Sequence, residues 1–239
     1  MKHRLTTLIL ASVSLLTFSN AAFAQLKENF ALNFFWAGSA YSSKEYQISF
    51  PQSITPVDGK FRLDTAWRGG VRANVFDRGH WGQEFFYSFE PNTAHFIRRT
   101  TPQSSLDLRI QVHNLGANAL YYFGEDETRP VRAFATIGLG MTIYKLTTEA
   151  EQFVRDPRRG NVPDMDSSRE LAMNYGVGLK ARMGSYIGFR TDLRGFVGRN
   201  PSFGLARQST NPNATVFPAA GAINNGEVSA GLIFYFRKR

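Results

Sequence analysis

Hydrophobic and polar residues alternate along several stretches of the chain with a period of two. In the C-terminal segment one face of an extended chain carries only apolar side chains: Val228, Ala230, Leu232, Phe234 and Phe236. The opposite face begins with Glu227 and Ser229. Because successive side chains of a β-strand point to opposite faces, this pattern predicts strands with one apolar and one polar face.

The same alternation predicts eight strands, at residues 29–41, 60–76, 81–89, 105–123, 131–146, 169–183 and 186–198, and in a last strand that ends at Phe236. Short connections (77–80, 124–130, 184–185) alternate with long ones (42–59, 91–104, 147–168, 199–225). Short turns at one end and long loops at the other are typical of membrane barrels. We therefore predict an all-β fold, an up-and-down antiparallel eight-stranded transmembrane β-barrel.

The last strand carries a more specific motif. Ser229, Gly231, Phe234 and Phe236 match the spacing of a polar residue, a glycine and two aromatics. This motif resembles the sorting signal of bacterial outer-membrane β-barrel proteins, and the mature chain resembles the small OmpA/OmpX-like eight-stranded family. The resemblance implies location in the outer membrane and recognition by the barrel-assembly machinery during biogenesis. One departure is that three basic residues, 237–239, follow the final aromatic.

The N-terminus has the elements of a secretory signal peptide. Lys2 and Arg4 precede an apolar stretch, and Ala22 and Ala24 form a small-x-small cleavage site before Gln25. We expect residues 1–24 to be the signal peptide and residues 25–239 the barrel domain. The chain contains no cysteine, so an exported protein of this sequence has no disulfides to hold it together.

The chain is basic, with 28 Lys and Arg against 19 Asp and Glu and a net charge of +9. Removal of Lys2 and Arg4 with the signal peptide reduces this net charge to +7. Because an exported protein rarely meets nucleic acid, the expected partners are outer-membrane lipids and lipopolysaccharide, and the expected state is a monomer. Basic loop residues offer contacts to lipopolysaccharide phosphates, although exposed loops are also polar simply because water surrounds them.

A set of charged residues is predicted to point into the lumen: Arg62, Asp64, Arg68, Arg72, Glu84, Asp107, Arg109, Arg132, Lys180, Arg182, Arg190, Asp192, Arg194 and Glu227. Eight strands leave an interior just wide enough for side chains. Since a lone buried ion is costly, we expect these charges to pair and plug the barrel. We expect Glu84 to lie nearest Arg72. The excess of bases leaves a narrow anion-conducting path as the alternative.

Candidate catalytic chemistry is sparse. His95 with Ser104 or Ser105 is the only arrangement that suggests acyl transfer, and no nucleophile motif supports it. We therefore expect neither catalysis nor a cofactor or metal. The expected function is that of a non-enzymatic outer-membrane protein whose loops serve surface contacts or envelope integrity. The alternatives are a small-solute or ion channel, a lipid-modifying enzyme, and a soluble barrel that carries a ligand inside.

Overall fold

A computed structural model describes residues 30–48, 57–98, 104–124, 130–159, 162–208 and 216–236. The predicted signal peptide with Ala22, Ala24 and Gln25, and residues 237–239, lie outside the described residues. Among the helices of the described part, none is long and apolar enough to cross a membrane.

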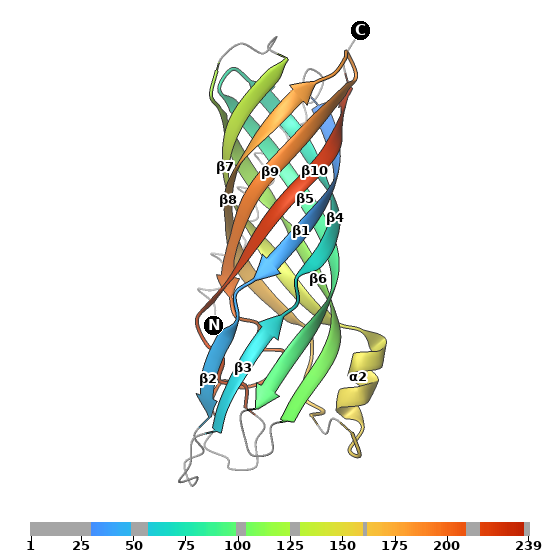
Figure 1. The fold of residues 1–239 in the computed structure, drawn as a ribbon, viewed down its shortest axis with the longest axis vertical. Coiled ribbons are helices and arrows are strands. Elements are labelled where there is room, and N and C mark those ends of the chain that lie inside the picture. Colours follow the sequence, from blue (N-terminus) through green and yellow to red (C-terminus); the bar gives the residue numbers. More distant parts are fainter. Residues whose placement is uncertain are drawn as a thin grey trace, which may run out of the picture.

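The described part of the chain is almost entirely strand (Figure 1). In chain order the elements are β1 (Phe30–Tyr41), β2 (Lys44–Ile48), β3 (Val57–Leu63), β4 (Ala66–Arg78), β5 (Trp81–Arg98), β6 (Ser104–Tyr122), β7 (Val131–Leu146), α2 (Thr148–Arg155), β8 (Ser168–Arg182), β9 (Ile187–Arg199) and β10 (Ala222–Phe236). The bounds of β7 are those that the sequence predicts.

Eight of the strands close into a barrel, and every pairing is antiparallel. The ring runs β1-β4-β5-β6-β7-β8-β9-β10, and β10 pairs back with β1 from Phe30↔Phe236 to Tyr41↔Asn225. The short strands β2 and β3 form a hairpin that continues beyond β1 and β4, with β3 also paired to β5. The predicted eight-stranded up-and-down barrel is therefore confirmed.

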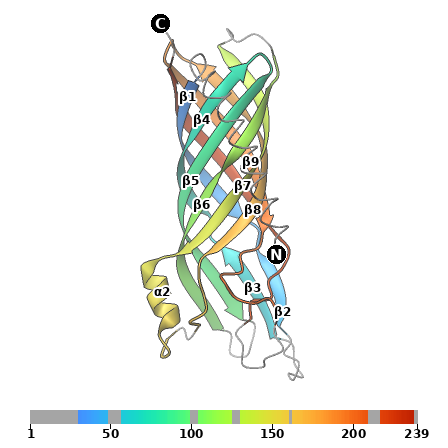
Figure 2. The same cartoon turned by 180° about the vertical axis from the view of Figure 1, so that it is seen from behind.

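The two ends of the barrel differ. At one end lie the short connections, such as Gly79–His80, together with the first residue of β1 and the last of β10. At the other end β2, β3 and the long strands β5 and β6 extend beyond the closed ring, and α2 stands beside them (Figures 1 and 2). We call these the turn end and the loop end.

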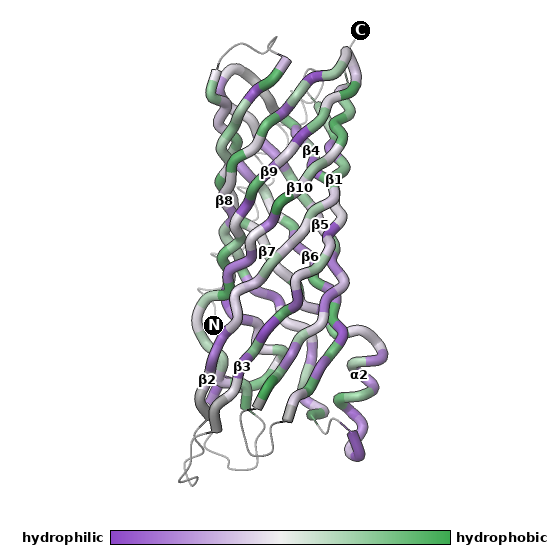
Figure 3. The backbone as a smooth tube through the Cα atoms, viewed as in Figure 1, coloured by the Kyte–Doolittle hydropathy of each residue, from purple (hydrophilic) through white to green (hydrophobic). Residues whose placement is uncertain are grey.

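The outer wall is apolar over most of its length. Large hydrophobic side chains are highly exposed there, including Trp36 (61%), Leu139 (72%) and Leu171 (76%). Hydrophobic and hydrophilic residues alternate along the strands of the wall (Figure 3). Exposed apolar side chains in this number require a lipid environment rather than water.

Two strands differ from their predicted course. β5 continues to Arg98, so most of the stretch predicted as the loop 91–104 is strand. The second predicted strand is split at Asp64 and Thr65 into β3 and β4. Odd-numbered residues such as Phe61 and Leu63 point inward in β3, whereas even-numbered ones such as Arg68 and Arg72 do so in β4. The break therefore reverses which face is inside.

The side chain of Asn92 on β5 bridges this break. The backbone N–H of Asp64 donates to Asn92 Oδ1 at 2.9 Å, and Asn92 Nδ2 donates to the backbone oxygen of Asp64 at 3.0 Å. One amide side chain thus supplies the donor and the acceptor that the interrupted ladder would have provided.

Candidate functional site: the filled interior

The interior of the barrel is divided into three layers along its axis. The inward residues of β6 show the division: Leu108, Ile110 and Val112 near the loop end, then Asn114 and Asn118, then Leu120 and Tyr122 near the turn end. The middle layer is polar and charged, and it lies between two apolar clusters. The strand keeps one inward face throughout while the chemistry of that face changes twice.

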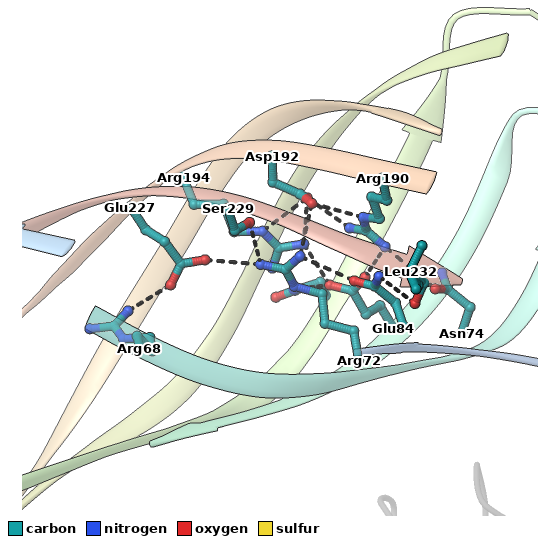
Figure 4. A network of polar contacts seen from close by, with 12 residues as sticks. Arg68, Arg72, Asn74, Glu84, Arg190, Asp192, Arg194, Glu227, Ser229 and Leu232 are labelled. Atoms are coloured by element: carbon teal, nitrogen blue, oxygen red, sulfur yellow. Dashed lines mark hydrogen bonds and ion pairs between the residues drawn. The ribbon is translucent and has the colours of Figure 1, made fainter. Parts of the chain in front are cut away.

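The middle layer holds an ion network of four arginines and four carboxylates: Arg68, Arg72, Arg190, Arg194, Glu84, Glu90, Asp192 and Glu227. Figure 4 labels these residues apart from Glu90. All eight side chains are buried. The network as a whole is neutral, because the four positive charges match the four negative ones. Burial of so many ions is tolerable only because each is paired.

One branch of the network runs from β5 to β10. The Arg68 guanidinium contacts Glu90 Oε2 at 2.9 Å and Glu227 Oε2 at 2.7 Å. Tyr41 and Ser39 also donate hydrogen bonds to Glu90, at 2.9 and 2.6 Å. The other oxygen of Glu227 accepts from Arg72 at 2.9 Å. Glu227 therefore joins two arginines of β4.

The second branch centres on β9. Asp192 contacts Arg72 at 2.8 Å, Arg190 at 2.8 Å and Arg194 at 3.0 Å. Glu84 of β5 contacts Arg190 at 2.6 Å and Arg194 at 2.7 Å, and it also accepts from Asn118. The expectation that Glu84 lies nearest Arg72 is wrong, because the long side chains of Arg190 and Arg194 on β9 reach Glu84 across the interior.

Small residues on β6, β7 and β8 make room for larger side chains inside the barrel. Inward positions on this wall are glycines at 116, 138, 140, 176 and 178. A Cβ on Gly176 would lie 2.9 Å from Arg194 Cγ, and one on Gly116 would lie 2.9 Å from the Phe86 ring. These five inward glycines, here called the glycine wall, therefore leave space that larger side chains of adjacent strands, such as Arg194 and Phe86, occupy.

Apolar clusters close the charged layer on both sides. The base cluster near the turn end consists of Leu120, Tyr122 and Phe134. The mouth cluster near the loop end consists of Phe61, Leu63, Ala94, Phe96, Leu108, Ile110, Val112, Tyr144, Leu146, Ala150, Val154, Met165, Phe203, Leu205, Phe217, Ala219 and Ile223. Both lie inside the wall, where an open channel would need a polar lining.

The segment between β9 and β10 contributes to the mouth cluster. Phe203 has a φ of +52° and Gly204 a φ of +76°, and the turn that they make places the Phe203 ring inward. The ring centroid of Phe203 lies 5.5 Å from that of Phe96 and 6.0 Å from that of Phe61. Positive φ is uncommon for a bulky residue, so burial of the ring offsets local strain.

Three of the charges predicted to point into the lumen lie near the turn end of the barrel, below the charged middle layer. Lys180 is buried and donates to the Tyr122 hydroxyl at the base cluster. Arg132 is half-buried and donates to the backbone oxygen of Gly79 at 2.6 Å, so it lies at the turn end. Arg182 is exposed, with its guanidinium 4.8 Å from the Tyr235 ring centroid. These three residues lie outside the ion network described above.

Four of the predicted lumen charges face outward, so that prediction is wrong for them. Arg62 and Asp64 are about half exposed and contact each other at 3.6 Å. Asp107 and Arg109 lie on the outer face of β6, with side chains 54% and 77% exposed. The cause is that β3 and the first part of β6 lie at the loop end. There the apolar face packs inward, and the polar face meets water.

Glu90 was missed by sequence reasoning. The run Glu90-Pro-Asn-Thr has the composition of a turn, so the predicted strand ended at Phe89. Pro91 instead lies within β5, opposite Gln111, with its ring exposed on the outer face. The even-numbered positions carry a signal for a longer strand, since Glu84, Ser88, Glu90 and Asn92 form a polar face that is interrupted by Phe86 alone.

His95 lies on the outer face at the loop end, between two carboxylates. Its Nε2 is 3.0 Å from Asp64 and its Nδ1 is 2.8 Å from Asp107. These carboxylates raise the pKa of His95 above its usual value, against the opposing effect of desolvation. Both ring nitrogens contact carboxylates, so neither is directed at Ser104 or Ser105. Among the described residues, no group of three or more His, Asp and Glu is arranged to hold a metal.

The residues of the sorting motif occupy both faces of β10. Phe234 and Phe236 are exposed on the outer wall near the turn end, at 37% and 54%. Ser229 is buried and accepts from Arg72 at 2.9 Å. Gly231 allows close packing of β10 against β1, because a Cβ there would lie 2.2 Å from the backbone oxygen of Phe34.

A closed antiparallel barrel with an apolar outer wall and a charged interior defines the class of membrane-spanning β-barrel proteins. The family model described as outer membrane protein beta-barrel domain matches residues 8–234. The chain belongs to this family, and its location is the bacterial outer membrane. In such barrels short turns face the periplasm and long loops face outward, so the loop end is extracellular.

Solved structures show the same fold at low sequence identity. The outer membrane protein OprG of Pseudomonas aeruginosa is 12% identical, with a TM-score of 0.53 over 90% of this chain and 98% of that one. The outer membrane protein AlkL, solved in lipid bilayers, is 12% identical, with a TM-score of 0.51 over 89% of this chain and 92% of that one. A search of curated proteins finds no match.

Proposed function

We propose that this protein is a non-enzymatic outer-membrane barrel whose interior is closed and whose extracellular end serves surface contacts or envelope integrity. The observation that carries the proposal is the neutral network of four arginines and four carboxylates, packed between the mouth cluster and the base cluster. An ion that crossed this layer would have to break pairs of buried charges, and it would also have to pass two apolar clusters.

The extracellular end favours a role in contacts with other molecules rather than in the transport of solutes. The mouth cluster gives the loop end a hydrophobic core of its own, to which β3, β5, β6, β7 and α2 contribute. A core of this kind holds the surrounding outer surface in a fixed shape. Such a surface suits contact with other molecules of the envelope.

A water-filled path along the glycine wall is the second candidate. Polar atoms of Ser88, Asn114, Asn118, Thr136 and Asn174 are buried without hydrogen-bond partners among the described residues. Buried polar atoms of this kind commonly bind ordered water. Water at these positions would hydrate the middle layer, although the mouth cluster and the base cluster still lie above and below it.

Single-channel recording in a planar bilayer separates these candidates. Purified protein is first shown to be folded by heat-modifiable migration and is then reconstituted from the same preparation. The closed barrel gives no conductance steps above those of protein-free bilayers. Reproducible steps with a defined ion selectivity would replace the proposal by the channel. Turnover of phospholipid or lipid A acyl chains by the same preparation would replace it by an enzymatic function.

A further inference from the structure

Four basic residues lie on the outer face at the extracellular ends of consecutive strands. Arg109 is on β6, Lys145 is the second-last residue of β7, Arg169 is the second residue of β8, and Arg199 is the last residue of β9. All four are exposed. We call them the rim cluster; Figure 2 shows this side of the barrel.

The register of the strands makes each member a neighbour of the next. Lys145 is opposite Gln111, two residues from Arg109. Arg169 is opposite Ile143, two residues from Lys145. Ala172↔Gly198 places Leu171 opposite Arg199, and Leu171 is two residues from Arg169. Diagonal neighbours on one face of a sheet lie within reach of long side chains.

The rim cluster lies where the apolar wall ends. Towards the periplasm the next outward residue of β8 after Arg169 is Leu171, which is 76% exposed. Leu139 on β7 and Leu193 on β9 continue the apolar wall at 72% and 58%. A basic row directly above exposed apolar side chains is placed at the level of lipid headgroups.

Carboxylates neutralise little of the positive charge of the rim cluster. Among the described residues its one carboxylate contact joins Arg109 to Glu149 at 3.7 Å, and both side chains are more than three-quarters exposed. A pair that is so exposed to solvent is weak. The positive charge of Lys145, Arg169 and Arg199 is therefore available to an anion.

We propose that the rim cluster binds the phosphate groups of lipopolysaccharide in the outer leaflet. Guanidinium and ammonium groups form charge-assisted hydrogen bonds with phosphate, and the arginines do so in a bidentate manner. The apolar wall below would contact the acyl chains of the same molecule. This inference depends on the location of the protein and not on whether its interior conducts, so failure of one proposal leaves the other standing.

The test measures lipid A binding to the full-length mature barrel in detergent by native mass spectrometry. The probes are lipid A with both phosphates and the same lipid A without phosphate. The test variant is Lys145→Gln/Arg169→Gln/Arg199→Gln. The matched control is Arg155→Gln/Arg158→Gln/Arg159→Gln, which removes the same charge from exposed positions on and after α2. A third variant, Arg169→Lys/Arg199→Lys, keeps the charge of the rim.

The rim variant should bind phosphorylated lipid A at least about tenfold more weakly, since it loses several charge-assisted contacts. The control should bind as the wild type does, the lysine variant should retain most of the affinity, and all proteins should bind the phosphate-free probe alike. Unchanged affinity of the rim variant, or equal loss in rim and control variants, would overturn the proposal. If the rim variant does not fold, the single variant Arg199→Gln replaces it. Weaker binding of phosphorylated lipid A by the folded single variant supports the proposal, and full affinity overturns it.

Discussion

At the scale of single residues, the interior is governed by the cost of burying charge. Each arginine of the network contacts two carboxylates, and every carboxylate except Glu90 contacts at least two arginines. Because neighbouring members share partners, the network is continuous from Glu90 to Glu84. Removal of one member therefore leaves a buried charge with one charged partner fewer.

Glu84→Gln tests this directly. The substitution keeps the shape of the side chain and leaves Arg190 and Arg194 with one charged partner fewer. The free energy of unfolding should fall by about 3–5 kcal/mol, measured by urea unfolding in detergent. Glu149→Gln breaks an exposed pair and should change the unfolding free energy little. Equal stability of the Glu84 variant and the wild type would show that these buried pairs do not hold the barrel.

His95 gives the loop end a dependence on pH. Its pKa is raised in the folded state by Asp64 and Asp107. The stabilisation is therefore fully present below the unfolded value of about 6.5 and is lost as the pH rises through the folded value. The difference in unfolding temperature between the wild type and His95→Gln should be larger at pH 5.5 than at pH 8.5. A difference that grows towards high pH would contradict the arrangement of this histidine between two carboxylates.

The sequence predicts the buried charges of β4, β9 and β10, because there charged and apolar residues alternate inside the membrane-spanning wall. It fails for Arg62, Asp64, Asp107 and Arg109, where the same alternation occurs outside the membrane. A period of two identifies two faces of a strand and does not say which one is inside. Only the position of the segment relative to the lipid decides that.

At the scale of elements, β10 closes the barrel, and its glycines differ in the space around them. A Cβ on Gly231 would contact the backbone of β1, whereas one on Gly226 would meet nothing within 4 Å. Gly231→Ala should lower the free energy of unfolding by about 1–3 kcal/mol, and Gly226→Ala should have a much smaller effect. Both are refolded from urea into detergent, without assembly machinery, so that packing alone is measured. Equal effects of the two substitutions would show that the close approach of β10 to β1 does not explain the glycine at position 231.

The aromatic end of β10 is predicted to act in assembly. Phe236 is 54% exposed on the outer wall, and Phe85 of β5 is similarly exposed at 53%. Phe236→Ala should reduce the heat-modifiable, membrane-integrated fraction in cells severalfold, whereas Phe85→Ala should leave most of it intact. Both variants should refold alike in detergent. Normal assembly of the Phe236 variant in cells would show that the assembly machinery does not require the terminal aromatic residue.

Strand prediction succeeds where one alternation continues without interruption, as in β7. It fails at Pro91, whose neighbours have the composition of a turn while its ring lies on the outer face of a paired strand. It also fails at Asp64 and Thr65, where a break reverses the inward face and Asn92 replaces the missing ladder contacts. Both features depend on partners far away in the sequence.

At the scale of the whole molecule, one barrel passes through two environments. Within the membrane it is apolar outside and charged inside, and beyond the membrane it is polar outside and apolar inside. The strand β6 spans both parts without changing its inward face. The sequence predicts the closed barrel and its location, whereas the extracellular core formed by α2 and the segment before β10 depends on long-range packing that periodicity does not encode.

The most direct test of this account is a single-cysteine scan along β6 in reconstituted protein, which the absence of native cysteines permits. Cysteines at 107, 109 and 111 should react with a water-soluble maleimide, and those at 108, 110 and 112 should be protected. Spin labels at 115, 117 and 119 should be relaxed by oxygen, which concentrates in lipid, and not by a water-soluble nickel complex. Reaction of maleimide at 108, 110 and 112, or contact of those positions with lipid, would contradict a barrel with a sealed apolar mouth.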